Sequence, residues 1–496
     1  MRNWLLALLG ATLLHGCTPS GPPRLSGDYR AVGELLVATR PDAISYRTEA
    51  NGETTGFEHD LLQALGNRLG VPVRFIVYPD ARKALDAVLQ GETHLAAAGL
   101  GRNERLPLRW SSALREVEYV VAARDDAPAL DEENDLAGHA IGVRRGSLAA
   151  EALEDIRRRV PGIKVRHPVR SDDQQLLEMV AKGELELAAT DRLHFALAAR
   201  FFPNLALARK LPIKSSIAWA LPAQGSDGLA EEVESFLADA RNNGLLARMG
   251  DRYFGHIRRL EQEDVSAFLS RIRERLPAFR RHFHDAQAVT GIDWRMLAAL
   301  AYQESQWDPL ATSRTGVRGM MMLTEDTADR MGVDDRLNPR ASIIGGARYF
   351  ALLREQLPDE VAEPDRSWMA LAAYNLGMGH FNSARQVARG LGKDISAWLD
   401  IKEVLPLLSK PAYASRLKSG PARGGEAVIT AENVRSYFEI LSRFEAPYVP
   451  PLEPPKFKLP ALRLGPRPKP TPPPSEVAPE MAEAGQGLRV RGEAED

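Results

Sequence analysis

The chain has 496 residues, which at roughly 150 residues per domain corresponds to about three folded units rather than one. Its composition is 44 % hydrophobic, 26 % charged and 7 % aromatic, which is typical of globular domains and argues against a polytopic membrane protein. The 64 basic and 66 acidic residues leave a net charge of −2, so no overall basic field attracts nucleic acid and no nucleic-acid partner is expected. A single cysteine excludes an internal disulfide and any metal site built from several cysteines.

The N-terminus has the layout of a secretory signal. Arg2 gives a positive start, and an apolar run follows from Trp4 to Leu14. The run is too short to span a bilayer. We therefore expect residues 1–16 to be a signal peptide.

The residues after this run point to a lipid anchor. Gly16 before Cys17 resembles a bacterial lipobox, which implies that the cysteine sulfur is lipidated and becomes the mature N-terminus. Thr18, not aspartate, follows, and in Gram-negative lipoproteins this implies sorting to the outer membrane. We expect a tether over 17–28 and a location at the periplasmic face of the outer membrane, lipid-anchored or peripheral. An ordinary cleaved signal with a chance cysteine is the alternative.

A first globular unit is predicted over 29–258. Apolar, strand-like runs at 35–38 and 73–77 alternate with segments of helical period such as 59–69. This alternation predicts α/β units around a mostly parallel sheet.

Three motifs in this unit resemble those of the family 3 periplasmic solute-binding proteins. They are GETTGFEHDL at 52–61, GETHL at 91–95 leading to GLGRNER at 99–105, and IGVRRGS at 141–147. The resemblance implies two lobes that close on a small ligand, an amino acid or a muropeptide. On an enzyme, such a unit would sense its ligand rather than transport it.

The resemblance also implies four ligand-binding residues. Arg105, at the start of a predicted helix, would bind a ligand carboxylate with its guanidinium group, and Ser147 would add donors from the second lobe. Asp191 would bind a ligand ammonium group, and Tyr46 would pack over the aliphatic part of the ligand. The alternatives are structural, with Arg105 on the surface, Asp191 as a helix N-cap and Tyr46 in the core.

A second, mostly helical unit is predicted over 263–446, because strand-like runs disappear after Arg258. The charged stretch 258–263 would join it to the first unit. Helical periods cover 265–276, 279–289, 294–304, 343–355, 368–374 and 431–442.

Glu304 is the candidate for acid chemistry in this unit. It lies at the end of the predicted helix 294–304, beside the apolar stripe of that helix. Loss of hydration and the negative end of the helix dipole both disfavour a charged carboxylate there, so its pKa should rise. A carboxyl of raised pKa suits protonation of a glycosidic oxygen. A solvated glutamate at a helix end is the alternative.

Three motifs follow Glu304 and Ser305 in order. They are ATS at 311–313, GVRGMMMLT at 316–324 and ALAAYNLGMGH at 370–380. The set resembles the lysozyme-like catalytic domain of the soluble lytic transglycosylase family. The GMMML sequence departs from the more usual GLMQ of that family, and with a solute-binding domain in front this points to a membrane-bound subgroup. The implied fold is an α/β, two-lobed, periplasmic-binding-protein-like domain followed by a mostly α, lysozyme-like domain.

The resemblance assigns roles to these residues. Glu304 would be the single catalytic acid and base. Substrate would be bound by Ser305 and Ser313 in the cleft, Met321 and Met322 on its floor, Tyr374 and Asn375 at the sugar and its acetamido group, and Tyr437 with its hydroxyl near Glu304. The alternatives are core packing for the methionines and a helix C-cap with Gly377 for Tyr374 and Asn375.

The number of carboxylates suggests the reaction. A typical glycoside hydrolase uses two at a fixed separation. No second carboxylate has a setting comparable to that of Glu304, since Asp308 precedes Pro309 in a predicted turn. A single acid suggests an intramolecular nucleophile. The resemblance supplies one, the N-acetyl carbonyl of N-acetylmuramic acid, followed by attack of its O6 on C1.

We therefore expect non-hydrolytic cleavage of the β-1,4 bond between N-acetylmuramic acid and N-acetylglucosamine in peptidoglycan, leaving 1,6-anhydromuramoyl ends. No cofactor and no metal are expected, because His282, His284 and His380 lack a convincing ligand set. Two other functions stay open: a solute-binding receptor whose helical domain only grips peptidoglycan, and a hydrolytic muramidase. The proline-rich tail, 447–496, is predicted to be extended or disordered.

Overall fold

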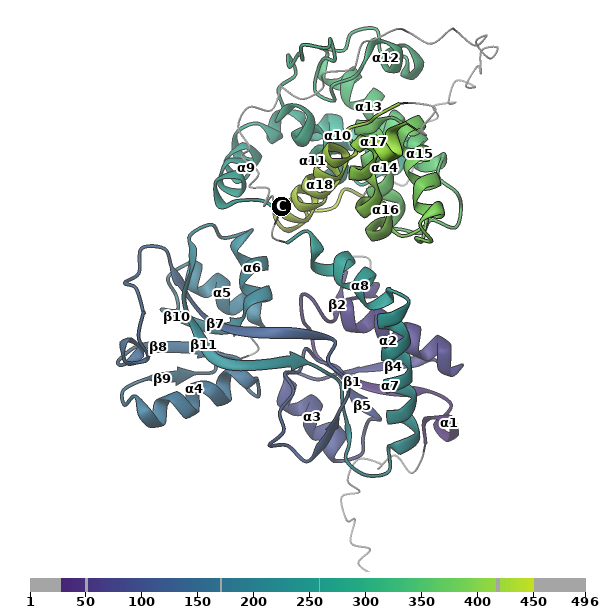
Figure 1. Cartoon of the computed structure of the whole chain (residues 1–496). Coiled ribbons are helices and arrows are strands. Elements are labelled where there is room, and N and C mark those ends of the chain that lie inside the picture. Colours follow the sequence, from purple (N-terminus) through teal and green to yellow (C-terminus); the bar gives the residue numbers. More distant parts are fainter. Residues whose placement is uncertain (1–27, 50–51, 170–171, 258, 416–419, 450–496) are drawn as a thin grey trace, which may run out of the picture.

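A computed structural model of the chain describes residues 28–49, 52–169, 172–257, 259–415 and 420–449. The expected signal peptide, Cys17 and most of the tail lie outside the described residues. Figure 1 shows two α/β lobes side by side and a helical unit that covers them. The predicted order, a two-lobed α/β domain followed by a mostly α domain, is confirmed. Within the described ranges, no helix combines the length and the apolar character needed to cross a bilayer.

The first lobe is built on a five-stranded sheet of order β4-β1-β5-β12-β6. Every residue of the interior strand β1 is buried, as expected for a strand covered by helices on both faces. The lobe comprises α1 (Tyr29–Val32), β1 (Leu35–Thr39), the small pair β2 (Arg47–Thr48) and β3 (Thr54–Thr55), α2 (Phe57–Leu69), β4 (Val73–Val77), α3 (Ala81–Leu89), β5 (Leu95–Ala96), β6 (Leu108–Trp110), β12 (Ala220–Pro222) and α7 (Asp227–Asn242).

The second lobe carries the sheet β11-β7-β10-β8-β9. Each of its α-helices follows a strand, and the residues at their N-termini, Ser147, Asp173 and Asp191, lie at the cavity that faces the first lobe. The lobe comprises β7 (Arg115–Arg124), η1 (Glu133–Leu136), β8 (Ala140–Val143), α4 (Leu148–Arg159), β9 (Lys164–Arg166), α5 (Asp173–Ala181), β10 (Leu187–Asp191), α6 (Arg192–Ala199) and β11 (Leu205–Ile217).

The sheets are mixed, which corrects the expectation of a mostly parallel sheet. β1 pairs in parallel with β4 and β5, and β8 with β9 and β10. β7 pairs antiparallel with β10 and β11, and β12 with β5 and β6. The chain enters the second lobe along β7 and returns along β11, so these two long strands run in opposite directions (Figure 1).

The helical unit begins after a connection made of α8 (Leu245–Gly250) and the π-helical turn η2 (Asp251–Gly255). The predicted helix 265–276 is interrupted at Arg275, because Pro277 lacks an amide hydrogen and is tolerated only in the first turn of the next helix. The unit comprises α9 (Gln262–Glu274), α10 (Leu276–Thr290), α11 (Trp294–Ser305), α12 (Glu325–Met331), α13 (Pro339–Glu355), α14 (Asp365–Leu376), α15 (Met378–Gly390), α16 (Trp398–Val404), η3 (Leu405–Ser409), α17 (Pro411–Ala414) and α18 (Gly424–Phe444).

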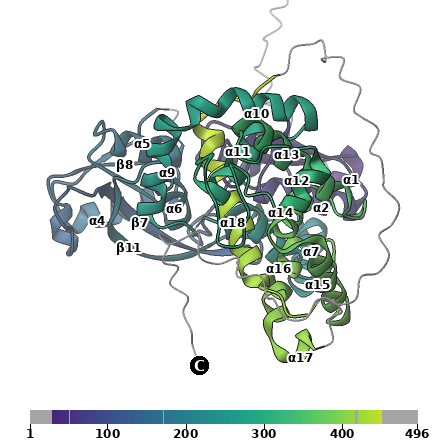
Figure 2. The same cartoon turned by 90° about the horizontal axis from the view of Figure 1, so that it is seen from above.

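The long helix α18 is the centre of this unit. It packs against α11 and α14, and Figure 2 shows it, in yellow-green, beside both. Its apolar residues face these helices, whereas the buried Arg435 and Ser436 and the half-buried Glu439 face the connection and the second lobe. One helix therefore contacts the helical core on one side and the α/β unit on the other.

Candidate active site

Glu304 lies at the end of α11, where the chain reverses sharply. Gln306 and Trp307, the residues that follow the helix, have left-handed backbone angles, φ 54° and 59°, which non-glycine residues rarely adopt. Burial of the Trp307 indole holds this turn, and its Nε1 donates a hydrogen bond of 2.8 Å to the carbonyl of Ala298. The turn leaves the Glu304 side chain half-buried at the helix end.

The Glu304 carboxyl is held by its surroundings in the protonated form. Burial raises its pKa from 4.5 to about 8, and no charged neighbour contributes to this shift. Among the described residues, none contributes to this shift through a hydrogen bond or an ion pair with the carboxyl. A protonated carboxyl at neutral pH is what a general acid requires.

The loop 319–323 beside Glu304 is fixed by side chains from three helices. Ser305 of α11 donates a hydrogen bond of 2.8 Å from its hydroxyl to the carbonyl of Met320. The Tyr374 hydroxyl, on α14, donates to the carbonyl of Met321 at 2.8 Å. Ser342 of α13 accepts from the amide of Met321 at 3.2 Å. Ser305 and Tyr374 therefore hold the loop as well as lying in the region of the expected cleft.

The methionines of this loop have different environments. Met320 and Met321 are fully buried, so the alternative of core packing applies to both. Met321 packs so closely on α13 that a Cβ at Gly346 would lie 2.6 Å from its side chain. Met322 is half-buried and has a left-handed φ of 45°.

Tyr374 lies near Glu304. Burial raises the pKa of the Tyr374 hydroxyl well above 10, and the Glu304 carboxylate adds to this rise. Asn375 is half-buried in the last turn of α14, which ends at Gly377 with φ 84°. Ser313 lies in a turn, where its hydroxyl accepts from the amide of Val317 at 3.2 Å and lies 2.9 Å from that of Thr315.

Tyr437 is buried in an aromatic cluster. Its ring packs against Phe268 and Tyr302, with centroids 4.5 and 4.8 Å away, on the side of α11 that faces α18. The approach of its hydroxyl to Glu304 stays a prediction. Tyr437 therefore packs α18 onto the helix that carries Glu304.

Two residues that fix the site were not identified from the sequence. Besides Ser342, Arg336 donates from Nη1 to the carbonyls of Gly316 and Leu323, at 2.9 and 3.1 Å, and so closes the base of the loop. Neither residue belongs to a motif, and no local pattern marks a side chain that acts on a backbone carbonyl elsewhere in the chain.

The cleft between the lobes contains two of the four ligand-binding residues expected there. Ser147 and Asp191 line a small cavity between the lobes. Both are also N-caps, Ser147 of α4 and Asp191 of α6, so the structural alternative applies to Asp191 as well. Tyr46 is buried against His59 and Phe75 rather than lining this cavity.

Arg105 lies at the rim of the cleft. Its side chain is 70 % exposed and forms an ion pair of 3.2 Å with Asp155 of the second lobe. The helix expected after it does not form, because Pro107 favours extended backbone before it, and β6 follows. Arg40 and Arg144, which the sequence analysis did not select, line the cavity instead.

Comparison with known proteins agrees with this architecture. Residues 35–256 match the model of the bacterial extracellular solute-binding proteins, family 3, and residues 281–396 match that of the transglycosylase SLT domain. Among solved structures, an ancestral arginine-binding protein bound to arginine aligns with 45 % of this chain and 98 % of its own length, at 20 % identity and a TM-score of 0.41.

Relatives in other bacteria are similar over nearly their whole length. A protein of Thiobacillus denitrificans is 41 % identical over 90 % of this chain and 94 % of its own, and one of Methylobacillus flagellatus is 39 % identical over 91 % and 96 %. A third, from Pseudomonas fluorescens, is 38 % identical over 89 % and 90 %. All three are named membrane-bound lytic murein transglycosylase F. The chain therefore belongs to the family of the membrane-bound lytic murein transglycosylases F.

Proposed function

We propose that this chain is a lytic transglycosylase that cleaves the β-1,4 bond between N-acetylmuramic acid and N-acetylglucosamine in peptidoglycan without consuming water. The observation that carries the proposal is the single carboxyl of Glu304, whose pKa burial alone raises to about 8. A second catalytic carboxylate close by would add its own charge to that shift, and none does. Membership of the family supports the same substrate.

Glu304 would serve twice in the reaction. Its proton passes to the glycosidic oxygen as the bond from that oxygen to C1 breaks, while the acetamido carbonyl oxygen of the N-acetylmuramic acid bonds to C1. The Glu304 carboxylate then takes the proton of the C6 hydroxyl, and O6 bonds to C1 as the bond between C1 and the acetamido oxygen breaks, which leaves the acetamido group intact on C2. A pKa near neutral suits a group that first donates and then accepts a proton.

The other site residues have distinct proposed roles. Asn375, Ser313 and the half-buried Met322 would contact the sugars, whereas Ser305 would act as a positioning residue through the carbonyl of Met320. Tyr374 would do both, since it holds the loop and lies near Glu304. Tyr437 is proposed to position α11 through the ring of Tyr302.

The α/β unit is proposed to bind a small solute, in agreement with the family model that it matches. We place this unit at 29–258 and the catalytic unit at 263–446, and the connection η2, after which the described residues form helices but no named strand, supports this division. Lipidation of Cys17 and attachment to the outer membrane are also proposals, and the membrane-bound relatives support association with a membrane. Loss of the chain from the membrane fraction on Cys17→Ser would test the anchor.

The activity is tested by digesting purified peptidoglycan sacculi with the chain and weighing the released muropeptides. We expect products one water lighter than those of a hydrolytic muramidase, and none with Glu304→Gln. Glu355→Gln is the matched control, because Glu355 is an exposed glutamate at the end of another helix, α13. It should digest sacculi like the unaltered chain.

Two results would contradict the proposal. Hydrated reducing ends would identify a hydrolytic muramidase. If neither the chain nor the Glu355→Gln control released muropeptides, but both still bound sacculi, the chain would be a peptidoglycan-binding receptor.

A further inference from the structure

The two lobes of the α/β unit are closed on each other in the structure. Asn103 of the first lobe donates to the carboxylate of Glu151 at 2.9 Å, and Arg105 pairs with Asp155 at 3.2 Å, both across the mouth of the cleft. The cavity that remains between the lobes has a volume of about 40 Å³. At about 10–15 Å³ per water on this measure, it has room for a few water molecules only.

A carboxylate of the chain itself, Asp42, contacts cations of both lobes in this cleft. Asp42 follows β1 in the first lobe and is buried. Its Oδ1 accepts hydrogen bonds from the amides of Ile44 and Ser45 at 2.9 and 2.8 Å, and its Oδ2 lies 3.0 Å from Nη2 of Arg40. Across the cleft, the same Oδ2 lies 3.2 Å from Nε2 of His194 and 3.6 Å from Nη1 of Arg144.

The two cations of the second lobe, His194 and Arg144, face Asp42, and each is also held by a carboxylate of its own lobe. Nδ1 of His194 lies 2.6 Å from Asp191, and Arg144 forms an ion pair with Asp173. Burial by itself would lower the pKa of His194, but the carboxylates of Asp191, Asp42 and Asp173 raise it well above 6.5. His194 therefore carries a positive charge where it faces Asp42.

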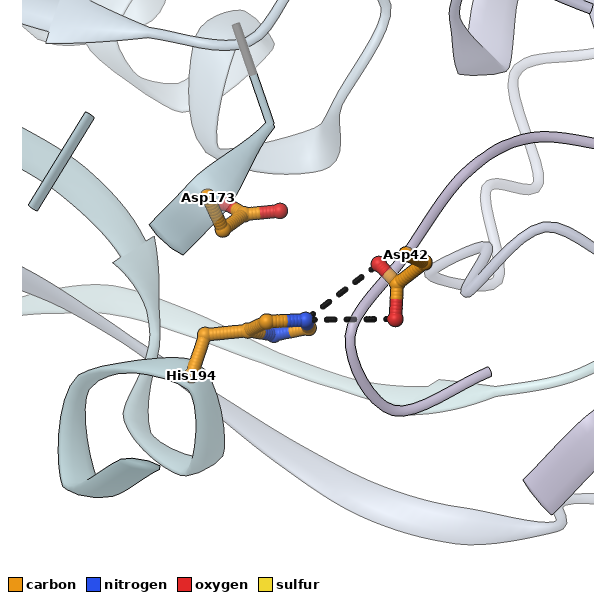
Figure 3. Close-up of side chains that lie close together, drawn as sticks. All are labelled: Asp42, Asp173 and His194. Carbon is orange, nitrogen blue, oxygen red and sulfur yellow. Dashed lines mark hydrogen bonds and ion pairs between the residues drawn. The ribbon is translucent and has the colours of Figure 1, made fainter. Parts of the chain in front are cut away.

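The cluster of Asp42, Asp173 and His194 in Figure 3 brings together ligand types that bind metal ions, with their ligand atoms within 4.8 Å of one another. A metal ion does not fit this cluster, however. Arg40 and Arg144 already contact its carboxylates, and a divalent cation would lie against two guanidinium groups and a charged imidazole. The excess of cations around Asp42 favours an anion there.

Among the described residues, one hydrogen-bond donor of Arg40 in this site has no acceptor. Nη1 of Arg40 is buried and has no hydrogen-bond acceptor among the described residues, whereas its Nε donates to the carbonyl of Ala98 at 2.6 Å. Arg40 also lines the remaining cavity. An unused, buried guanidinium hydrogen costs free energy, and an incoming carboxylate would satisfy it.

We propose that Arg40, Arg144 and His194 form a carboxylate-binding site between the lobes, and that Asp42 occupies this site when no solute is bound. The lobes then close on an internal carboxylate. A solute must carry a carboxylate group of its own and must displace Asp42 in order to bind. This inference concerns the α/β unit alone and does not rest on the proposed cleavage of peptidoglycan.

The test measures the distance between the lobes in the full chain. Spin labels are placed at Lys83→Cys in the first lobe and Lys164→Cys in the second, both exposed, with Cys17→Ser to remove the native thiol. Without any solute we expect one short distance. Asp42→Ala, which empties the site, should shift most molecules to a longer distance, and sodium acetate should restore the short one where sodium chloride does not.

Matched variants keep the test decisive. Asp86→Asn removes a half-buried carboxylate of the first lobe that pairs with the exposed Arg82, and it should leave the distance unchanged. His194→Gln should open the lobes without any change to the Asp42 loop, and it serves as the second variant if Asp42→Ala does not fold.

Several results would overturn the proposal. The first is a long distance between the lobes in the unaltered chain without solute. The second is a short distance in Asp42→Ala or in His194→Gln. The third is an Asp42→Ala variant whose lobes open but do not close again in sodium acetate. Opening of the unaltered chain by a chelator would assign the cluster to a metal ion instead. The test measures the distance between the lobes, so its result does not depend on whether the chain cleaves peptidoglycan.

Discussion

At the scale of single residues, the site depends on groups held in unfavourable states. Glu304 is protonated because it is poorly hydrated, and Gln306, Trp307 and Met322 have left-handed backbone around it. Such states persist only where the surrounding packing determines them, as the buried Trp307 does here. These residues therefore lower the stability of the native chain, and a substitution at the site should be able to raise stability while it lowers activity.

Glu304→Gln should make the chain more stable near neutral pH while it abolishes cleavage. Between pH 4.5 and about 8 the unfolded chain has lost the Glu304 proton and the native chain keeps it, so native stability falls as the pH rises through this window. Glutamine removes that dependence. We expect a gain of about 1–2 kcal/mol at pH 7, reduced from the full shift because the side chain is only half-buried, and no gain at pH 4.

Urea unfolding of both proteins at pH 4, 7 and 8 measures this difference. The exposed Glu355→Gln should show no such dependence on pH. A Glu304→Gln variant that is less stable than the unaltered chain at pH 7 would contradict the assigned pKa.

Gly319 is the glycine on which the loop beside Glu304 depends. Its φ is 82°, and an added Cβ would lie 1.8 Å from the carbonyl oxygen of Arg336. Gly316 has the same φ but open space around it. Gly319→Ala should therefore cost about 3 kcal/mol or more of stability and most of the activity, whereas Gly316→Ala should cost only the backbone strain of about 1 kcal/mol.

Thermal unfolding and sacculus digestion of the two variants check this prediction. Equal losses in both would mean that the backbone angle matters and that the close approach to Arg336 does not.

At the scale of elements, the connection at η2 and helix α18 share a partly buried hydrogen bond. Nε2 of His256, just after η2, lies 2.8 Å from Glu439 of α18, and Arg200 of the second lobe pairs with the same carboxylate. Burial and the nearby charge of Arg435 lower the pKa of His256 to about 4, so the imidazole is neutral at neutral pH.

This contact predicts a loss of stability in acid. As the pH falls from 6.5 to about 4, the unfolded chain takes up a proton at His256 and the native chain does not, so the native state loses stability in this window. We expect a loss of about 2 kcal/mol, and the slope should be smaller in His256→Gln. Urea unfolding at pH 7 and pH 4.5 measures both, and parallel slopes in the two proteins would refute the assignment.

The elements also show how far the sequence predicts this structure. The helices of the catalytic unit, Glu304 at the end of α11 and the loop motif were predictable, because helical period and motif spacing are local features. The partners of Asp42 were not, since His194 lies 152 positions away and pairs with it only when the lobes close. The same holds for Tyr437: its position on α18 was predictable, but its ring contact with Tyr302 of α11 was not.

At the scale of the whole molecule, the catalytic unit is fastened to both lobes. On the side of the second lobe, Arg200 pairs with Glu439 and Arg443 with Glu178. On the side of the first lobe, the Tyr253 hydroxyl of the connection donates to Asp60, and Arg252 bonds to Asp365 of the catalytic unit at 2.6 Å. Any movement between the lobes must therefore strain one of these attachments or carry the catalytic unit along.

The two attachments to the second lobe should differ strongly in strength. The Arg200 side chain is 3 % exposed, so Glu439→Gln leaves a buried guanidinium without its counter-charge and should destabilise the chain by about 3–5 kcal/mol. The Arg443 side chain is 41 % exposed, and Arg443→Gln should cost about 1 kcal/mol or less. Because Glu439 joins two units, its loss should also split thermal unfolding into two calorimetric transitions, whereas Arg443→Gln should leave the profile of the unaltered chain. Equal effects of the two substitutions would mean that the units are held together by α18 and the connection, and that the buried ion pair adds nothing.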